Sequence, residues 1–315
     1  MKKPKTPAAP LPTTTTTVPA GFTIDYFDGK TEGGPRRGYQ IDGEEAVSVT
    51  TVLGCLDKPA LPWWGMKVGV QGVLELVRLG LLQPATHPVE NYPTLAYVVE
   101  GQAYVATDES IIRGLLTPQK LTVNHVRDKA AVRGQNAHDA FEAWAAVGQV
   151  PDPDAYPLEE RGYVQGLLNF INDTQGNFHA DDQEIIVGSK EHLFAGRYDL
   201  RAHTTGEMRL VTSAYTTSGD IRKRGPNYVT VPAGIKILAD LKTSKGIYGS
   251  HLLQLEGYEG ASVECGYEPT DARAVIHVTA DGLYEVKRAR ASYEDFLAIL
   301  ATYHAVERTE AALKA

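Results

Sequence analysis

The chain has 315 residues, of which 43% are hydrophobic and 22% charged, as in an ordinary soluble globular protein with one large domain or two small ones. The formal net charge of −8 argues against a protein that coats DNA without regard to sequence, but it allows a cleft whose carboxylates bind cations. The only cysteines, Cys55 and Cys265, exclude a four-cysteine zinc or iron–sulfur site built from this chain alone and favour a reducing compartment.

Residues 1–20 contain Lys-Pro-Lys, further prolines and alanines, and a run of five threonines, which together predict a disordered tail. The tail has no apolar segment of the kind that secretory signals carry. No stretch of the chain reaches the ~18 apolar residues that a transmembrane helix needs. We therefore expect a cytoplasmic protein without a membrane partner.

Residues 21–120 are expected to form a helical N-terminal elaboration, either part of the main domain or a small subdomain. Two short strands and two helical stretches are expected in it, at 22–27, 39–41, 48–53 and 65–80. Either Ser48 or Thr50 is expected to cap the first helical stretch. The proline-rich segment Lys58–Trp64 is expected to separate the two stretches.

Residues 121–290 change from helical spacing to the alternation of strands. Helices are expected near 118–146, 158–172 and 250–263, and strands near 183–188, 193–202, 236–242, 275–279 and 284–287, with a long hairpin or loop over 206–232. This order predicts an α/β (α+β) fold with a central mixed sheet flanked by helices. Residues 291–315 are expected to add a C-terminal helix.

Asp240 and Lys242 close the expected strand 236–242. Side chains alternate across a strand, so both should point to one face, with Leu241 buried behind them. The strand is apolar on both faces, which places it in the middle of the sheet. A charged pair is costly in such a position, and this favours a functional role over a surface ion pair.

Further candidates precede and follow this pair. Asp199 stands three residues after Gly196 in an expected strand, Glu184 lies in the strand before it, and His138 is on a helix. Each has an alternative role without a reaction: Asp199 as an acid at a strand end, Glu184 as a solvated acid, and His138 as a core histidine. Gln254 and Tyr258 share one helix face, where an amide and a phenol can contact a phosphate or a base edge, or can simply form helix surface.

Taken in order, these residues resemble the PD-(D/E)XK nuclease superfamily, in its RecB-like branch, which includes CRISPR-associated exonucleases and phage-encoded members. The pattern of that branch is Arg-Gly-x3-His on a helix, a strand Glu, Gly-x2-Asp, Asp-x-Lys and Gln-x3-Tyr. This chain matches it at Arg133, Gly134, His138, Glu184, Gly196, Asp199, Asp240, Lys242, Gln254 and Tyr258. The match spans about 125–290, and a looser similarity to phage-encoded members covers 48–51 and 58–64.

The resemblance implies a restriction-endonuclease-like core and metal-dependent hydrolysis of DNA, most directly by an exonuclease of phage or bacterial DNA recombination, replication or repair. It implies Mg²⁺ or Mn²⁺ as the cofactor. The ligands would be His138, Asp199, Asp240 and the carbonyl of Leu241. Lys242 would orient the attacking water, and Glu184 would act behind the ligands or on the substrate side. The implied substrate-binding residues are Arg133, Thr243, Gln254 and Tyr258.

The chain departs from many relatives because its two cysteines cannot hold their iron–sulfur cluster. It also lacks a Gly-x4-Gly-Lys-Ser/Thr motif, so we expect a stand-alone nuclease. Its partner would be DNA, and a recombination annealing protein or a helicase is a further candidate partner. The run Arg222–Arg224 would contact phosphates, unless it is a solvated loop. The pattern specifies neither the polarity of digestion nor an oligomeric state.

Two alternatives belong to other classes. One is a catalytically silent DNA-binding accessory with the same fold, against which the intact Asp-x-Lys argues. The other is an HD-type metal phosphohydrolase using the doublet His138-Asp139 with His125. That family needs a mostly helical domain, whereas strands are expected here after residue 180.

Overall fold

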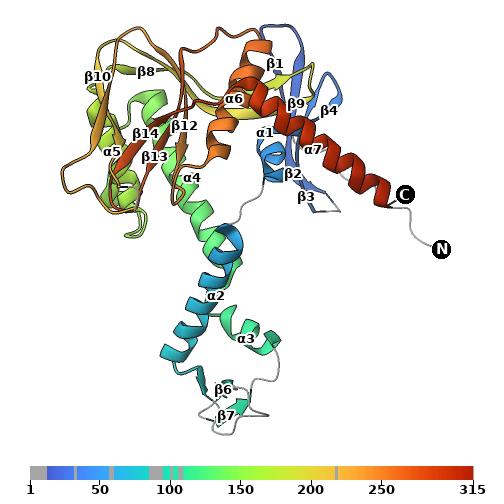
Figure 1. The fold of residues 1–315 in the computed structure, drawn as a ribbon, viewed down its shortest axis with the longest axis vertical. Coiled ribbons are helices and arrows are strands. Elements are labelled where there is room, and N and C mark those ends of the chain that lie inside the picture. The colour runs from blue at the N-terminus through green and yellow to red at the C-terminus, as the bar shows by residue number, and fades with distance from the viewer. Residues whose placement is uncertain are drawn as a thin grey trace. The chain divides into compact units, whose positions relative to one another are not determined.

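The computed structural model describes residues 13–31, 34–56, 60–84, 95–99, 102–105, 109–216 and 219–314 (Figure 1). The chain divides into two compact units. One unit comprises Met1–Leu56 and Asn136–Ala315, and the other comprises Asp57–Gln135.

The first unit is built around a mixed sheet. Within the described residues it has nine strands, in the order β1-β2-β3-β4-β9-β12-β13-β14, with β8 also paired to β9. The strands are β1 (Thr13–Thr17), β2 (Thr23–Thr31), β3 (Gly34–Ile41), β4 (Glu44–Ser48), β8 (Phe178–Ser189), β9 (Phe194–Thr204), β12 (Lys236–Lys242), β13 (Ala272–Val278) and β14 (Tyr284–Arg288). The pairs β4–β9 and β12–β13 are parallel and the others antiparallel. The expected α/β fold with a central mixed sheet is confirmed.

Helices flank this sheet. They are α1 (Val49–Val52), the second half of α4 (Val123–Val147), α5 (Arg161–Thr174), α6 (Gly249–Glu264) and α7 (Tyr293–Lys314), with short 3-10 turns at Leu53–Cys55 and Pro153–Ala155. The side chains of β12 enter two separate cores. Leu238 packs with residues of α6 and α7 such as Phe296, whereas Leu241 packs with residues of α4 and α5 such as Phe170. The prediction that 236–242 is a central strand, apolar on both faces, is confirmed.

A smaller antiparallel hairpin comes after β9, as the sequence predicts for 206–232. It consists of β10 (Met208–Ser213) and β11 (Asn227–Val231). The buried carboxylate of Glu285 accepts hydrogen bonds from the backbone N–H groups of Ala214 at 2.5 Å and Tyr215 at 3.2 Å. These bonds hold the end of β10 against β14.

The N-terminal strands correct two expectations. Thr13–Thr17, assigned to a disordered tail, forms β1 on β2, because β-branched threonines suit a strand and the next residue, Val18, is buried with 3% of its surface exposed. Residues 1–12 lie outside the described part. The elaboration expected over 21–120 is divided at residue 56, because β4 pairs with β9 and brings the preceding strands into the sheet.

The unit Asp57–Gln135 contains α2 (Ala60–Arg78), α3 (Glu109–Leu116), the first half of α4 and a sheet of β5 (Leu82–Pro84), β6 (Leu95–Val99) and β7 (Gln102–Val105). Its first helix begins at Ala60, earlier than the expected Gly65. Pro62 is compatible with this because it lies in the first turn, where a backbone N–H has no partner within the helix. In the part of the chain that the structure describes, no helix has both the length and the apolar character needed to cross a membrane.

Candidate active site

The candidate site lies where β9 lacks a strand partner along one of its edges. β8 pairs with the other edge through most of the length of β9. On the edge in question, β4 pairs with Phe194 and Ala195, whereas β12 pairs from Leu200 onward. Residues 196–199 therefore face a gap between the end of β4 and the end of β12.

Asp199 occupies the side of this gap next to β12. The last ladder pair joins Ala239 to Leu200, so Asp199 stands at the first position after the pairing ends. Its Oδ2 accepts a hydrogen bond of 2.8 Å from the backbone N–H of Leu241. The Nδ1 of His138, on α4, lies 3.2 Å from the same oxygen. The structure thus brings a helix residue and two strand residues together, as the motif order predicts.

Asp240 and Lys242 point to one face of β12. The Lys242 Nζ lies 2.6 Å from Oδ2 of Asp240, and the side chains of Lys242 and Asp240 are 19% and 1% exposed. Leu241 is fully buried in the opposite core, so the expected alternation is confirmed. Despite the short distance, Oδ2 of Asp240 makes no hydrogen bond of ordinary geometry with any described residue. This buried oxygen therefore keeps a lone pair for another partner.

Burial and charge act in opposite directions on this pair. Burial raises the pKa of Asp240, and the Lys242 ammonium opposes that rise. Burial by itself would lower the pKa of Lys242, but the carboxylates of Asp240 and Asp199 outweigh it and the net shift is upward. Lys242 therefore stays an ammonium group near neutral pH.

Gln254 and Tyr258 lie on α6 next to the gap. The Gln254 Nε2 donates a 2.8 Å hydrogen bond to the Tyr258 hydroxyl. A Cβ at Gly196 would come within 2.4 Å of the Tyr258 ring, so only a glycine leaves room for the tyrosine. Burial raises the pKa of Tyr258 well above its ordinary value, and the Asp240 charge adds to the rise. Tyr258 therefore keeps its hydroxyl proton as a donor.

Glu184 lies opposite Asp199 on β8, between the ladder pairs Gln183–Leu200 and Ile185–Tyr198. Its φ of 53° is in the left-handed region, which is strained for a residue other than glycine, and such strain collects at functional sites. Its Oε2 lies 2.8 Å from the Nε of Arg197. Burial raises the pKa of Glu184, partly offset by Arg197. The sequence pattern did not single out Arg197, although its position between Gly196 and Asp199 could have indicated it.

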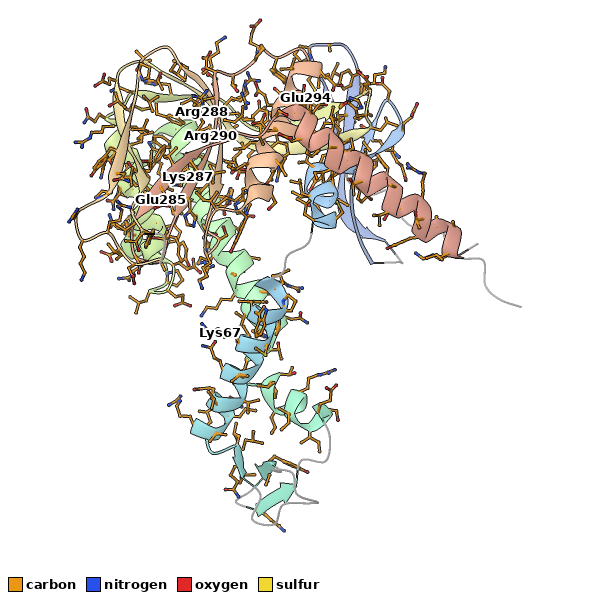
Figure 2. All side chains as sticks on the ribbon, in the orientation of Figure 1. Lys67, Glu285, Lys287, Arg288, Arg290 and Glu294 are labelled. Atoms are coloured by element: carbon orange, nitrogen blue, oxygen red, sulfur yellow. The ribbon has the colours of Figure 1, made fainter. Side chains whose placement is uncertain are left out.

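The roles of the remaining predicted residues stay predictions. Thr243 is buried directly after β12. Arg133 belongs to the unit Asp57–Gln135. Arg222–Arg224 lies in the loop between β10 and β11. Figure 2 shows cations that the sequence pattern did not single out, Lys287 and Arg288 on β14 and Arg290 two residues after its end.

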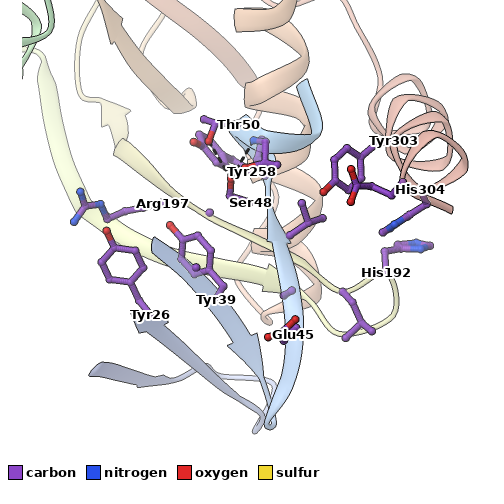
Figure 3. Close-up of a pocket in the computed structure, with 18 of the residues that line it drawn as sticks. Tyr26, Tyr39, Glu45, Ser48, Thr50, His192, Arg197, Tyr258, Tyr303 and His304 are labelled. Carbon is purple, nitrogen blue, oxygen red and sulfur yellow. Dashed lines mark hydrogen bonds between the residues drawn. The ribbon is translucent and has the colours of Figure 1, made fainter. Parts of the chain in front are cut away.

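A cavity of about 850 Å³ adjoins the gap (Figure 3). Its walls come from β2, β3, β4, α1, β9, α6 and α7, and they include Tyr26, Tyr39, Ser48, Thr50, Arg197 and Tyr258.

The Ser48 hydroxyl caps α1 by accepting a 3.0 Å hydrogen bond from the N–H of Thr51, which confirms Ser48 over Thr50 as the cap.

The gap contains donor atoms of the kinds that bind divalent cations. Two carboxylates and a backbone carbonyl are oxygen ligands of the kind that Mg²⁺ and Mn²⁺ prefer, the His138 imidazole would add a nitrogen, and a lone pair of Asp240 Oδ2 is available. The N–H and C=O of one strand residue point to the same edge, so the Leu241 carbonyl faces the Asp199 side. Among the described residues no three His, Cys, Asp or Glu side chains form a metal-holding group. Here His138 pairs with Asp199, and Asp240 pairs with Lys242, so a cation would replace these contacts.

Neither a family model nor a curated protein matches this chain.

Proposed function

We propose that the chain is a divalent-metal-dependent deoxyribonuclease of the RecB-like branch of the PD-(D/E)XK superfamily, with a restriction-endonuclease-like core. The proposed activity is exonucleolytic hydrolysis of phosphodiester bonds in phage or bacterial DNA recombination, replication or repair.

One observation carries this proposal. A buried Asp240–Lys242 ion pair ends a central strand beside Asp199, at a gap in the sheet that borders a cavity. A buried ion pair contributes little net stability, since desolvation of the two charges offsets their attraction. Its place next to a second carboxylate is better explained by a reaction that needs both signs of charge. Hydrolysis of a phosphodiester needs carboxylates for the cation and a positive charge near the phosphate.

Each residue at the gap has a definite part in this reaction. Asp199, Asp240, His138 and the carbonyl of Leu241 would hold Mg²⁺ or Mn²⁺, which supplies a more acidic bound water and neutralises charge on the phosphate. The Lys242 ammonium would orient the attacking water and offset the developing negative charge. Tyr258, fixed by Gln254, would donate a hydrogen bond from its hydroxyl group to a phosphate oxygen.

The test is a cleavage assay on end-labelled linear and circular DNA, single- and double-stranded, with Mn²⁺, Mg²⁺ or EDTA. We expect metal-dependent loss of linear DNA. Asp240→Ala would leave the Lys242 ammonium buried without its partner, which costs about 3–5 kcal/mol in stability. Asp240→Asn keeps the shape of the side chain, and the double variant Asp240→Asn/Lys242→Met removes both charges together.

Asp240→Asn and the double variant are expected to lose cleavage by about 100-fold or more while keeping the circular dichroism spectrum of the wild type. Glu310→Gln, which also removes one negative charge but at an exposed position on α7, should cleave like the wild type. Full activity in a folded Asp240→Asn protein would refute the site. DNA binding without cleavage in the wild type would favour the catalytically silent accessory. The HD-type alternative is disfavoured by the sheet, because that family needs a mostly helical domain.

A further inference from the structure

We propose that the cavity next to the candidate site is a nucleotide subsite, in which an unpaired base packs against the rings of Tyr26 and Tyr39. The adjoining phosphate is held by Arg197 and by the hydroxyl groups of Ser48 and Thr50. This inference rests on the proposed nuclease function, and it names residues that would position the substrate strand for cleavage.

The cavity and the gap share residues of β9. Gly196 and Arg197 line the cavity, and Asp199 comes two residues later, bonded to the N–H of Leu241. Tyr258 joins the two regions, because it lines the cavity and packs on Gly196. A strand whose phosphate lies at the carboxylates would therefore have its neighbouring nucleotide in the cavity. The volume of about 850 Å³ is within the ~300–1,000 Å³ typical of ligand sites.

The two tyrosines form an aromatic wall. They are a cross-strand pair of β2 and β3, with ring centroids 5.1 Å apart and ring planes inclined at 37°. Both are half-buried, and the Tyr26 hydroxyl donates a 3.0 Å hydrogen bond to Asp28. A cross-strand pair stabilises a hairpin wherever it occurs, but this one also faces a cavity. Stacking of a base on such a ring contributes about 1–3 kcal/mol and tolerates any base.

The charges in the cavity favour one orientation of the bound nucleotide. The Arg197 side chain is 48% exposed, and its guanidinium group has donors besides the Nε that lies beside Glu184. The hydroxyl groups of Ser48 and Thr50 lie 3.1 Å apart. Other parts of the wall carry carboxylates, which would repel a phosphate, at Glu45, Glu191 and Glu307. A phosphate is therefore favoured at Arg197, and the base at the tyrosines.

Packing a base on these rings requires that it leave the duplex stack. The substrate at this position would then be a single-stranded or frayed end. A fluorescent base analogue tests this directly, because stacking on an aromatic ring quenches 2-aminopurine. The probe is a single-stranded 12-mer with 2-aminopurine at one terminal position, in two versions labelled at the 5′ or 3′ end.

Binding is measured by titration with full-length Asp240→Asn protein, so that the probe is not degraded. Tyr26→Leu and Tyr39→Leu, each in this background, keep the apolar volume but lose the ring. We expect each to weaken binding about tenfold and to abolish quenching. Tyr26→Phe and Tyr39→Phe keep the ring and should restore both. Tyr228→Leu, on the exposed strand β11 outside the cavity, is the matched control and should bind like the parent.

Cleavage by the same tyrosine variants in the active background separates this inference from the proposed function. A wild type that cleaves DNA, together with Leu variants that bind, quench and cleave like it, would overturn the subsite and leave the nuclease standing. Tyrosine-dependent binding and quenching in a wild type that never cleaves would keep the subsite and overturn the nuclease. Melting temperatures of all variants identify any loss that is due to unfolding. Equal quenching of a blunt duplex and a single strand would overturn the requirement for an unpaired base.

Discussion

The buried pair of Asp240 and Lys242 differs from an ion pair that has only a structural role. The pair is almost entirely buried, yet Oδ2 of Asp240 lacks a hydrogen bond of ordinary geometry with any described residue. A structural ion pair at such depth normally has its remaining lone pairs satisfied. The contact with Lys242 leaves a lone pair of this oxygen unused, and the charge of Asp199 acts on the same carboxyl group, so the two carboxylates suit a shared cation. Loss of the Asp240 charge should therefore remove cation binding and cleavage together.

Gly196 is predicted to be essential because of its contact with Tyr258. In Gly196→Ala the new Cβ would come within 2.4 Å of a ring carbon, so the ring must shift. We expect a loss of about 1–3 kcal/mol in stability, measured by urea unfolding, and a fall of about 100-fold in cleavage. Gly54→Ala, where a Cβ meets nothing within 4 Å, is the control. Wild-type cleavage by Gly196→Ala would show that the position of Tyr258 is unimportant.

The two cysteines are predicted to differ in reactivity. Burial raises the pKa of Cys265 to about 11, whereas Cys55 is exposed. At pH 8 only about one Cys265 in a thousand would be a thiolate, the form that reacts. Titration with a thiol reagent should therefore modify Cys55 in the native protein and Cys265 only after denaturation. Rapid modification of both thiols in the native state would contradict the burial of Cys265.

The same shift gives a pH dependence of stability. The folded-state pKa of Cys265 lies above its ordinary value of 9.0. The stabilisation due to the neutral buried thiol is therefore complete below pH 9 and decreases as the pH rises through about 11. Cys265→Ala should show a smaller loss of stability than the wild type between these two pH values, measured by urea unfolding.

At the scale of elements, β1 shows that a low-complexity segment can be ordered by the packing of its neighbour in the chain. Val18, directly after β1, packs in the core shared with α6 and α7. We predict that Val18→Ala lowers the free energy of unfolding by about 2 kcal/mol, through lost burial and a residual cavity. Val147→Ala, at a position with 77% of its surface exposed, should change it by less than about 0.5 kcal/mol. No effect of Val18→Ala would indicate that this segment is not packed.

The end of β4 determines where the candidate site forms. β4 stops pairing with β9 after Ser48 and turns into α1, which leaves the edge of β9 unpaired at Gly196–Asp199. Strand edges are normally covered or paired. An unpaired edge inside a sheet, bordered by carboxylates on one side and by hydroxyl groups on the other, is where we expect a backbone phosphate to approach.

At the scale of the whole molecule, a cation bound at the gap would link β9, β12 and α4, and should stabilise the fold. A ligand at a concentration about 100-fold above its Kd adds about 2.7 kcal/mol to the free energy of unfolding. We therefore predict that Mn²⁺ raises the melting temperature by several degrees relative to EDTA, measured by differential scanning fluorimetry. Asp240→Asn should lose most of this shift, whereas Glu310→Gln should retain it. An equal shift in Asp240→Asn would place the cation elsewhere.

Much of the fold could be predicted from local patterns. The strand 236–242, the hairpin over 206–232 and the helices after residue 118 are indicated by alternation, helical spacing, and the positions of glycine and proline, all of which act within a few residues. The same alternation along a strand predicts that Asp240 and Lys242 share one face. It missed β1, because threonine-rich composition predicts disorder unless a partner strand is known.

The sequence by itself thus determined which residues are candidates for catalysis and which elements contain them. Only the tertiary structure decided that β4, from the N-terminal region, pairs with β9 and leaves the gap. It also placed the tyrosines of β2 and β3 at the wall of the same cavity as Arg197. The physical reason is that the pairing of β4 with β9 depends on burial between segments far apart in the chain, which no local spacing encodes.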